Sequence, residues 1–73
     1  EEQMMLRLRL REGILLSKLR EKFGAKTQKL EQRARLLQQH GLLLFDGEKL
    51  HLTPQGFLIS NSIIVDLLES VEN

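Results

Sequence analysis

Apolar side chains recur along most of this chain at the spacing expected of amphipathic helices. A helix is predicted over residues 14–23, where one helical stripe is formed by Leu15, Leu16, Leu19 and Phe23. Gly24 follows directly, and a glycine just past a helix commonly supplies a left-handed C-terminal cap. The pattern therefore predicts a helix that buries one face and ends at a turn.

A second clear helix is predicted over residues 27–40. Its apolar stripe consists of Leu30, Ala34 and Leu37. The hydroxyl of Thr27 is expected to cap the free N–H groups of the first turn. Glu31 and Arg35 have the spacing of an i,i+4 ion pair, and His40-Gly41 is expected to end the helix.

The segment 1–11 carries two competing patterns. Leucine alternates with arginine from Leu6 to Arg11, which is typical of a strand. However, Met4, Met5 and Leu8 share a helical face, and β-branched residues are absent. We therefore predict a helix over this segment, ended by the glycine at position 13.

The stretch 42–52 has the pattern of a β-hairpin. Residues 42–45 are apolar, Asp46-Gly47 suits a tight turn, and residues 49–52 alternate. Thr53-Pro54 then predicts a helix start, with threonine as the cap and proline in the first helical position. One long helix is predicted from there to the end of the chain, with an apolar face made of Phe57, Ile63, Ile64, Leu67, Leu68 and Val71.

The order helix, helix, helix, hairpin, helix predicts a mainly α fold with a small β-hairpin. Three helices followed by a hairpin form a winged-helix-like plan, here with an additional C-terminal helix. Seventy-three residues suffice for one domain, so residues 1–73 are interpreted as a single domain. The first residue is Glu1 rather than methionine, and we expect this domain to be part of a larger protein.

Composition narrows the function classes. The chain has no cysteine, which excludes disulfides, thiol nucleophiles and an iron–sulfur cluster held by its own thiolates. This agrees with a reducing compartment, and a cytoplasmic location is expected. No stretch approaches 18 apolar residues, so no membrane span is expected.

The residues that could carry chemistry are few and scattered. His40 and His51 are the only histidines, and they lack the company of ligands that a zinc site requires. No pair of carboxylates lies in an apolar setting that would raise a pKa, and no serine has a matching histidine and acid. We therefore expect no catalytic, cofactor-binding or metal-binding residue in this chain.

Charge opens an alternative, a winged-helix DNA-binding module. Residues 7–35 hold ten basic residues against Glu12, Glu21 and Glu31, a local balance of +7. Helix 27–40 would then be the recognition helix, presenting Gln28, Lys29, Gln32, Arg33 and Arg35. The wing tip, however, is acidic, at Asp46 and Glu48, which has the wrong sign for phosphates. A nucleic-acid partner is therefore the second choice.

Two segments are familiar in combination: residues 1–14, EEQMMLRLRLREGI, and residues 50–64, LHLTPQGFLISNSII. Phe23-Gly24 and residues 40–43 lie between them. In order and spacing these segments resemble the C-terminal domain of oxygen-independent coproporphyrinogen III oxidase-like proteins, which are radical S-adenosylmethionine (SAM) proteins. One branch of that family decarboxylates coproporphyrinogen III, and a shorter branch binds haem as a haem chaperone. Residues 56–62 are more similar to the second branch.

The resemblance implies an accessory role. The parent would be an oxidoreductase-like protein with an N-terminal radical SAM barrel that binds a 4Fe-4S cluster and S-adenosylmethionine. The present domain would pack on that barrel and help to cover its active site, and would meet porphyrin or haem only through the parent. Arg9, within the Leu8-Arg9-Leu10 signature, is the one residue carried over as a candidate contact; its alternative role is an ion pair inside the domain.

Overall fold

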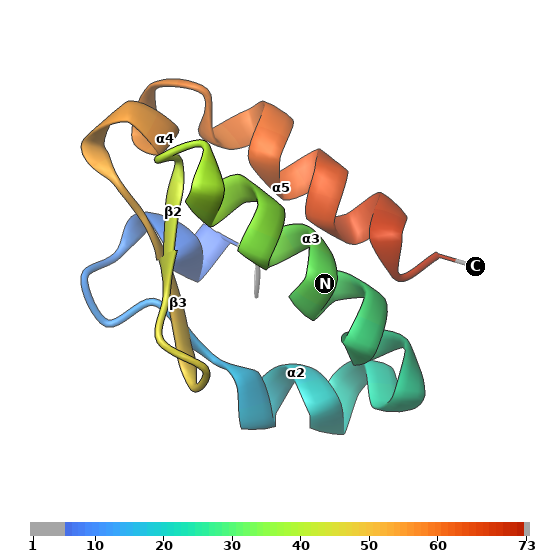
Figure 1. The fold of residues 1–73 in the computed structure, drawn as a ribbon. Coiled ribbons are helices and arrows are strands. Elements are labelled where there is room, and N and C mark those ends of the chain that lie inside the picture. Colours follow the sequence, from blue (N-terminus) through green and yellow to red (C-terminus); the bar gives the residue numbers. More distant parts are fainter. Residues whose placement is uncertain (1–5, 73) are drawn as a thin grey trace.

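Residues 6–72 are described by a computed structural model, in which a small sheet stands at one end of a group of helices (Figure 1). The elements, with η for a 3-10 helix, are η1 (Leu6–Arg9), β1 (Ile14–Leu15), α2 (Leu16–Phe23), η2 (Gly24–Lys26), α3 (Thr27–Gln39), β2 (Leu43–Phe45), β3 (Lys49–Leu52), α4 (Pro54–Leu58) and α5 (Ser60–Ser70). The prediction of a mainly helical fold with a small hairpin and a C-terminal helix is confirmed. No helix within residues 6–72 is both long and apolar enough to cross a bilayer.

The core gathers leucines from nearly every element. The side chains that are almost completely buried are Leu8, Leu19, Leu30, Leu43, Leu50 and Leu67. In Figure 1, α3 and α5 lie beside each other, while α2 crosses below α3. The predicted stripe of α3 is buried as expected. A single core therefore joins the helices to one face of the sheet.

The sheet has three antiparallel strands in the order β1-β3-β2, one more than predicted. Ile14 and Leu15, predicted as the start of a helix, instead pair with Leu50 and Lys49 of β3. Gly13 makes this possible: its φ is +64°, and a Cβ there would lie 2.1 Å from the carbonyl oxygen of Leu50. Helix α2 therefore begins two residues later than predicted.

The first segment is also less helical than predicted. Residues 1–5 lie outside the described residues, and residues 6–9 form only the short 3-10 helix η1. The chain then bends through residues 10–12 towards β1. A longer helix would carry the chain past the sheet edge, whereas a single turn buries Leu8 and returns the backbone to pair with β3.

Thr27 begins α3, but it does not cap that helix. The helical backbone of η2 runs straight into α3, so no extended residue precedes it. The Thr27 hydroxyl is buried and donates to the carbonyl oxygen of Leu19, at 3.1 Å. It therefore ties α3 to α2. Glycines at positions 24 and 41 have positive φ, in line with the predicted helix ends.

The hairpin is formed as predicted by β2 and β3, joined by residues 46–48. The Asp46 carboxylate accepts backbone N–H groups of Glu48 and Lys49, both at 2.9 Å. These hydrogen bonds, first that from Lys49, hold the pKa of Asp46 below its usual value. The acidic residue at the tip is therefore part of the turn structure.

The prediction of a single long C-terminal helix was wrong, because the helix is interrupted at Ile59, between α4 and α5. Gly56 on α4 is buried so closely against the hairpin that a Cβ would lie 1.9 Å from the Leu42 carbonyl oxygen. Helix α5 lies instead along α3. One straight helix cannot make both contacts. As a result, Phe57 is half exposed, at 53%, rather than part of the apolar face.

The predicted cap at Thr53 is confirmed and gives a first test. Its hydroxyl accepts the N–H of Gly56 at 3.0 Å and donates to the Gly41 carbonyl at 2.6 Å. Thr53→Ala removes both bonds and should lower the free energy of unfolding by about 1–2 kcal/mol, measured by urea titration. Thr53→Ser keeps the hydroxyl and should retain most of that free energy. Equal losses in the two variants would contradict the cap.

The close approach of α4 to the hairpin gives a second test. Gly56→Ala forces the Leu42 carbonyl away and should cost about 2 kcal/mol or more, read from the thermal unfolding midpoint. Gln55→Ala, at the exposed neighbouring position, should stay within about 0.5 kcal/mol of the parent sequence. A tolerated Gly56→Ala would mean that α4 does not press on the hairpin.

Candidate functional site

The described residues offer no constellation for bond-making chemistry. His40 is exposed at the end of α3, and His51 is half-buried on β3 between two buried leucines. Within residues 6–72 no three His, Cys, Asp or Glu side chains gather in a way that could hold a metal ion. The 4Fe-4S cluster of the resemblance does not fit this chain, which supplies no thiolate.

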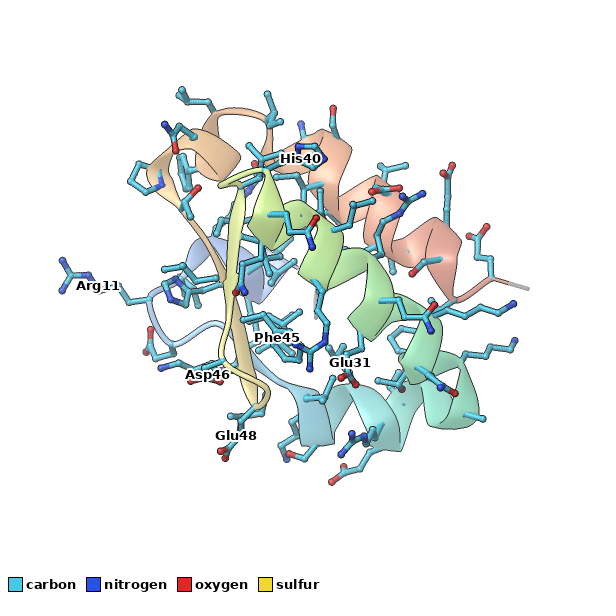
Figure 2. The ribbon with its side chains drawn as sticks, viewed as in Figure 1. Arg11, Glu31, His40, Phe45, Asp46 and Glu48 are labelled. Atoms are coloured by element: carbon cyan, nitrogen blue, oxygen red, sulfur yellow. The ribbon has the colours of Figure 1, made fainter. Side chains whose placement is uncertain are left out.

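The arginines of α3 do not form one face. Arg33 contacts Asp66 of α5 at 3.3 Å, whereas Arg35 pairs with Glu31 at 3.0 Å and lies over the ring of Phe45, 5.0 Å from its centre. In Figure 2, Phe45 lies beside the hairpin, and Glu31 lies between α3 and α2. The predicted Glu31–Arg35 pair is confirmed. Two of the proposed base-reading side chains are thus directed to neighbours within the domain, on opposite sides of the helix.

The hairpin tip adds to this picture. Asp46 and Glu48 lie at the outer end of the hairpin, as Figure 2 shows. Both are exposed, so the tip presents negative charge outward. A phosphate backbone would be repelled there. The arrangement of α3 and the tip together does not favour the DNA-binding alternative.

Arg9, the predicted contact residue, bonds within the domain. Its Nε donates to Ser60 Oγ at 2.9 Å and its Nη2 donates to Asn61 Oδ1 at 2.6 Å. The partners are neutral, so the expected internal ion pair is replaced by two hydrogen bonds. They join η1 to the first turn of α5. Sequence reasoning missed these partners because it did not place a helix start at Ser60.

Apolar surface is exposed in a pattern that the sequence only partly indicated. The stripe of α5 is buried, but the corner between α4 and α5 exposes three consecutive apolar side chains, residues 57–59, with Leu58 83% exposed. Further exposed apolar residues are Leu6, Leu10, Leu15, Leu36, Leu44 and Val65. Leu6, Leu10 and Leu15 cluster in sequence around η1 and β1. Exposed apolar side chains therefore gather at the corner and around η1 and β1, and Val65 is the exposed apolar residue of α5.

A groove of about 480 Å³ lies beside η1, β1 and the start of α2. Its lining is formed by Arg7, Glu12, Gly13, Ile14, Leu15, Lys18 and Lys49. None of these residues was predicted as a site, because the strand that brings Leu15 beside Lys49 was not foreseen. The only signal in the sequence was the leucine–arginine alternation before Gly13.

Comparison with known proteins identifies the family of the chain. Residues 1–59 match the model of the HemN C-terminal domain family. The heme chaperone HemW of Lactococcus lactis subsp. lactis (strain IL1403) is 37% identical over 70 residues, which make up 93% of this chain and 18% of that relative. The chain thus spans about a fifth of the length of the curated relative that it matches. No solved structure matches. Since the family match extends over most of the chain, from the N-terminal segment to the end of α4, the chain belongs to the HemN C-terminal domain family.

Proposed function

We propose that residues 1–73 form the C-terminal accessory domain of a larger, haem-related radical SAM protein. In this proposal the domain packs on the N-terminal radical SAM barrel of the same parent chain and helps to cover the barrel's active site. The observation that carries the proposal is the family match over residues 1–59, supported by the likeness to a heme chaperone. The parent would be an oxidoreductase-like protein or, as the named relative favours, a haem chaperone.

The cofactors of the proposal belong to the parent. A 4Fe-4S cluster and S-adenosylmethionine would be bound by the barrel, since this chain has no cysteine to ligate iron. When bound, the cluster and S-adenosylmethionine would supply radical chemistry. In the chaperone branch they would be present in a protein that binds haem. The present domain contributes exclusion of water and positioning through contact. Its exposed apolar side chains near η1 and at the α4–α5 corner fit that role, because burying them against a partner is favourable.

The proposal is tested on the whole parent protein. The sequence upstream of Glu1 should contain a Cys-x-x-x-Cys-x-x-Cys motif. A parent that lacks residues 1–73 should still assemble its iron–sulfur cluster, seen by its visible absorption, but should lose haem transfer or porphyrin decarboxylation. An upstream sequence without the motif, or a truncated parent with full activity, would contradict the accessory role.

Arg9 enters the proposal as the residue that fixes η1 against the first turn of α5. Arg9→Ala removes its hydrogen bonds to Ser60 and Asn61 and should lower the free energy of unfolding by about 1 kcal/mol in urea titration. Arg11→Ala is the matched control, because Arg11 is exposed and has no partner among residues 6–72. It should change stability by less than about 0.5 kcal/mol. If both variants are equally stable, Arg9 does not fix the segment.

A further inference from the structure

We infer that the groove beside η1 and β1 holds an extended segment of the preceding part of the parent chain, with an apolar side chain flanked by carboxylates. The inference rests on the proposed function, in which a larger body precedes this domain. It deepens that proposal by naming the face that docks and the chemistry of what docks there. Three features of the groove carry it: an apolar floor, a surplus of positive charge and an open strand edge.

The floor of the groove is Leu15. Leu15 is 41% exposed, whereas Leu50 on the neighbouring strand β3 is fully buried. The register pairs Leu15 with Lys49, which puts the two side chains next to each other on the outer face of the sheet. Gly13 forms a wall without a side chain. An apolar side chain entering the groove would therefore meet Leu15 and the aliphatic stems of the surrounding cations.

The rim of the groove is positively charged. The lining residues include three cations, Arg7, Lys18 and Lys49, and one carboxylate, Glu12. Lys49 also acts on the Asp46 carboxylate, where it contributes to the lowered pKa. Arg7 and Lys18 have no partner among the described residues. Because a cation that loses water needs a compensating charge, an occupant must bring carboxylates of its own.

The backbone beside the groove is open to pairing. Strand β1 lies at the edge of the sheet, with β3 on one side only. The N–H of Leu16 donates to the Glu48 carbonyl at 2.6 Å, and hydrogen-bonded pairs alternate in an antiparallel ladder. The N–H of Leu15 therefore points away from β3. An extended segment can take up this donor while its side chains enter the groove, as in strand addition.

The position of the groove beside the first described element, η1, favours the preceding part of the parent chain as its occupant. The family is that of a C-terminal domain, and the match covers only 18% of the relative's length, so the rest of such a parent precedes this chain. The described residues begin at η1, which supplies Arg7 to the groove. A tethered body is held there at high effective concentration. The α4–α5 corner exposes more apolar surface, but no charge at residues 57–59 selects an occupant.

Carbodiimide cross-linking of the full-length parent tests the inference, because this reagent joins a lysine amine directly to a carboxylate in contact with it. Lys18 and Lys49 should form amide links to Asp or Glu residues upstream of Glu1, identified by peptide mass spectrometry. Lys26 is the matched control, since it is exposed on η2 at the far end of α2. The groove lysines should yield about tenfold more such product than Lys26. Equal yields, or links from Lys26 alone, would overturn the inference.

Two variants test whether the cross-links depend on the groove. Leu15→Asp removes the apolar floor and adds a repelling carboxylate, yet Leu15 is the N-cap of α2, where aspartate is favoured, so the fold should persist. It should reduce the groove cross-links about fivefold or more, by the same charge and contact argument. Leu44→Asp, at a comparably exposed strand position, should leave them unchanged. Equal effects of the two variants would count against the groove.

The outcomes separate the inference from the proposed function. If the upstream sequence lacks the three-cysteine motif but Lys18 and Lys49 still cross-link to it, the radical SAM assignment fails and the docking face stands. If the motif is present and the cluster assembles, but the groove lysines do not cross-link upstream, the docking face is wrong and the assignment stands.

Discussion

The fold depends on close packing around the central strand β3, which pairs with β1 on one side and with β2 on the other. Leu50 is completely buried and has Ile14 on one side and Phe45 on the other. The approach of β1 requires a glycine at position 13, because any side chain would collide with the Leu50 carbonyl. A domain of this size has little core to spare, and no disulfide supports it. Its stability therefore rests on backbone contacts that only glycine permits, around a strand of four residues.

Local patterns predicted most of the elements correctly. The hairpin, helix α3, the Thr53 cap and the helix end at His40-Gly41 follow from side-chain spacing and turn chemistry within a few residues of each position. The errors share one cause, which is competition from distant partners. Ile14 and Leu15 continue a helical stripe in the sequence, but pairing with β3 decides their conformation. The break at Ile59 likewise results from two packing contacts, with the hairpin and with α3, that no local pattern contains.

The surface features also divide into those that local sequence indicated and those that depend on contacts between distant residues. Arg9 was singled out through the family signature Leu8-Arg9-Leu10, and the structure supplies its partner, Ser60, from 51 residues further along the chain. The groove could not be foreseen, since it exists only when β1 joins the sheet and brings Leu15 beside Lys49. The basic residues of α3 illustrate the converse. Their number suggested an anionic partner, whereas Arg33 and Arg35 are directed to carboxylates of the domain itself.

The three-stranded sheet also implies an order of events during folding. Strands β2 and β3 are joined by three residues, so their pairing closes a short loop at small entropic cost. Strand β1 pairs with β3 across about 35 residues that include α2 and α3, and it can do so only once β3 is in place. Strand β1 is thus the last part of the sheet to form and the first to separate. The wall of the groove can therefore open without unfolding the hairpin, and a segment bound along Leu15 would lock the sheet in its closed form.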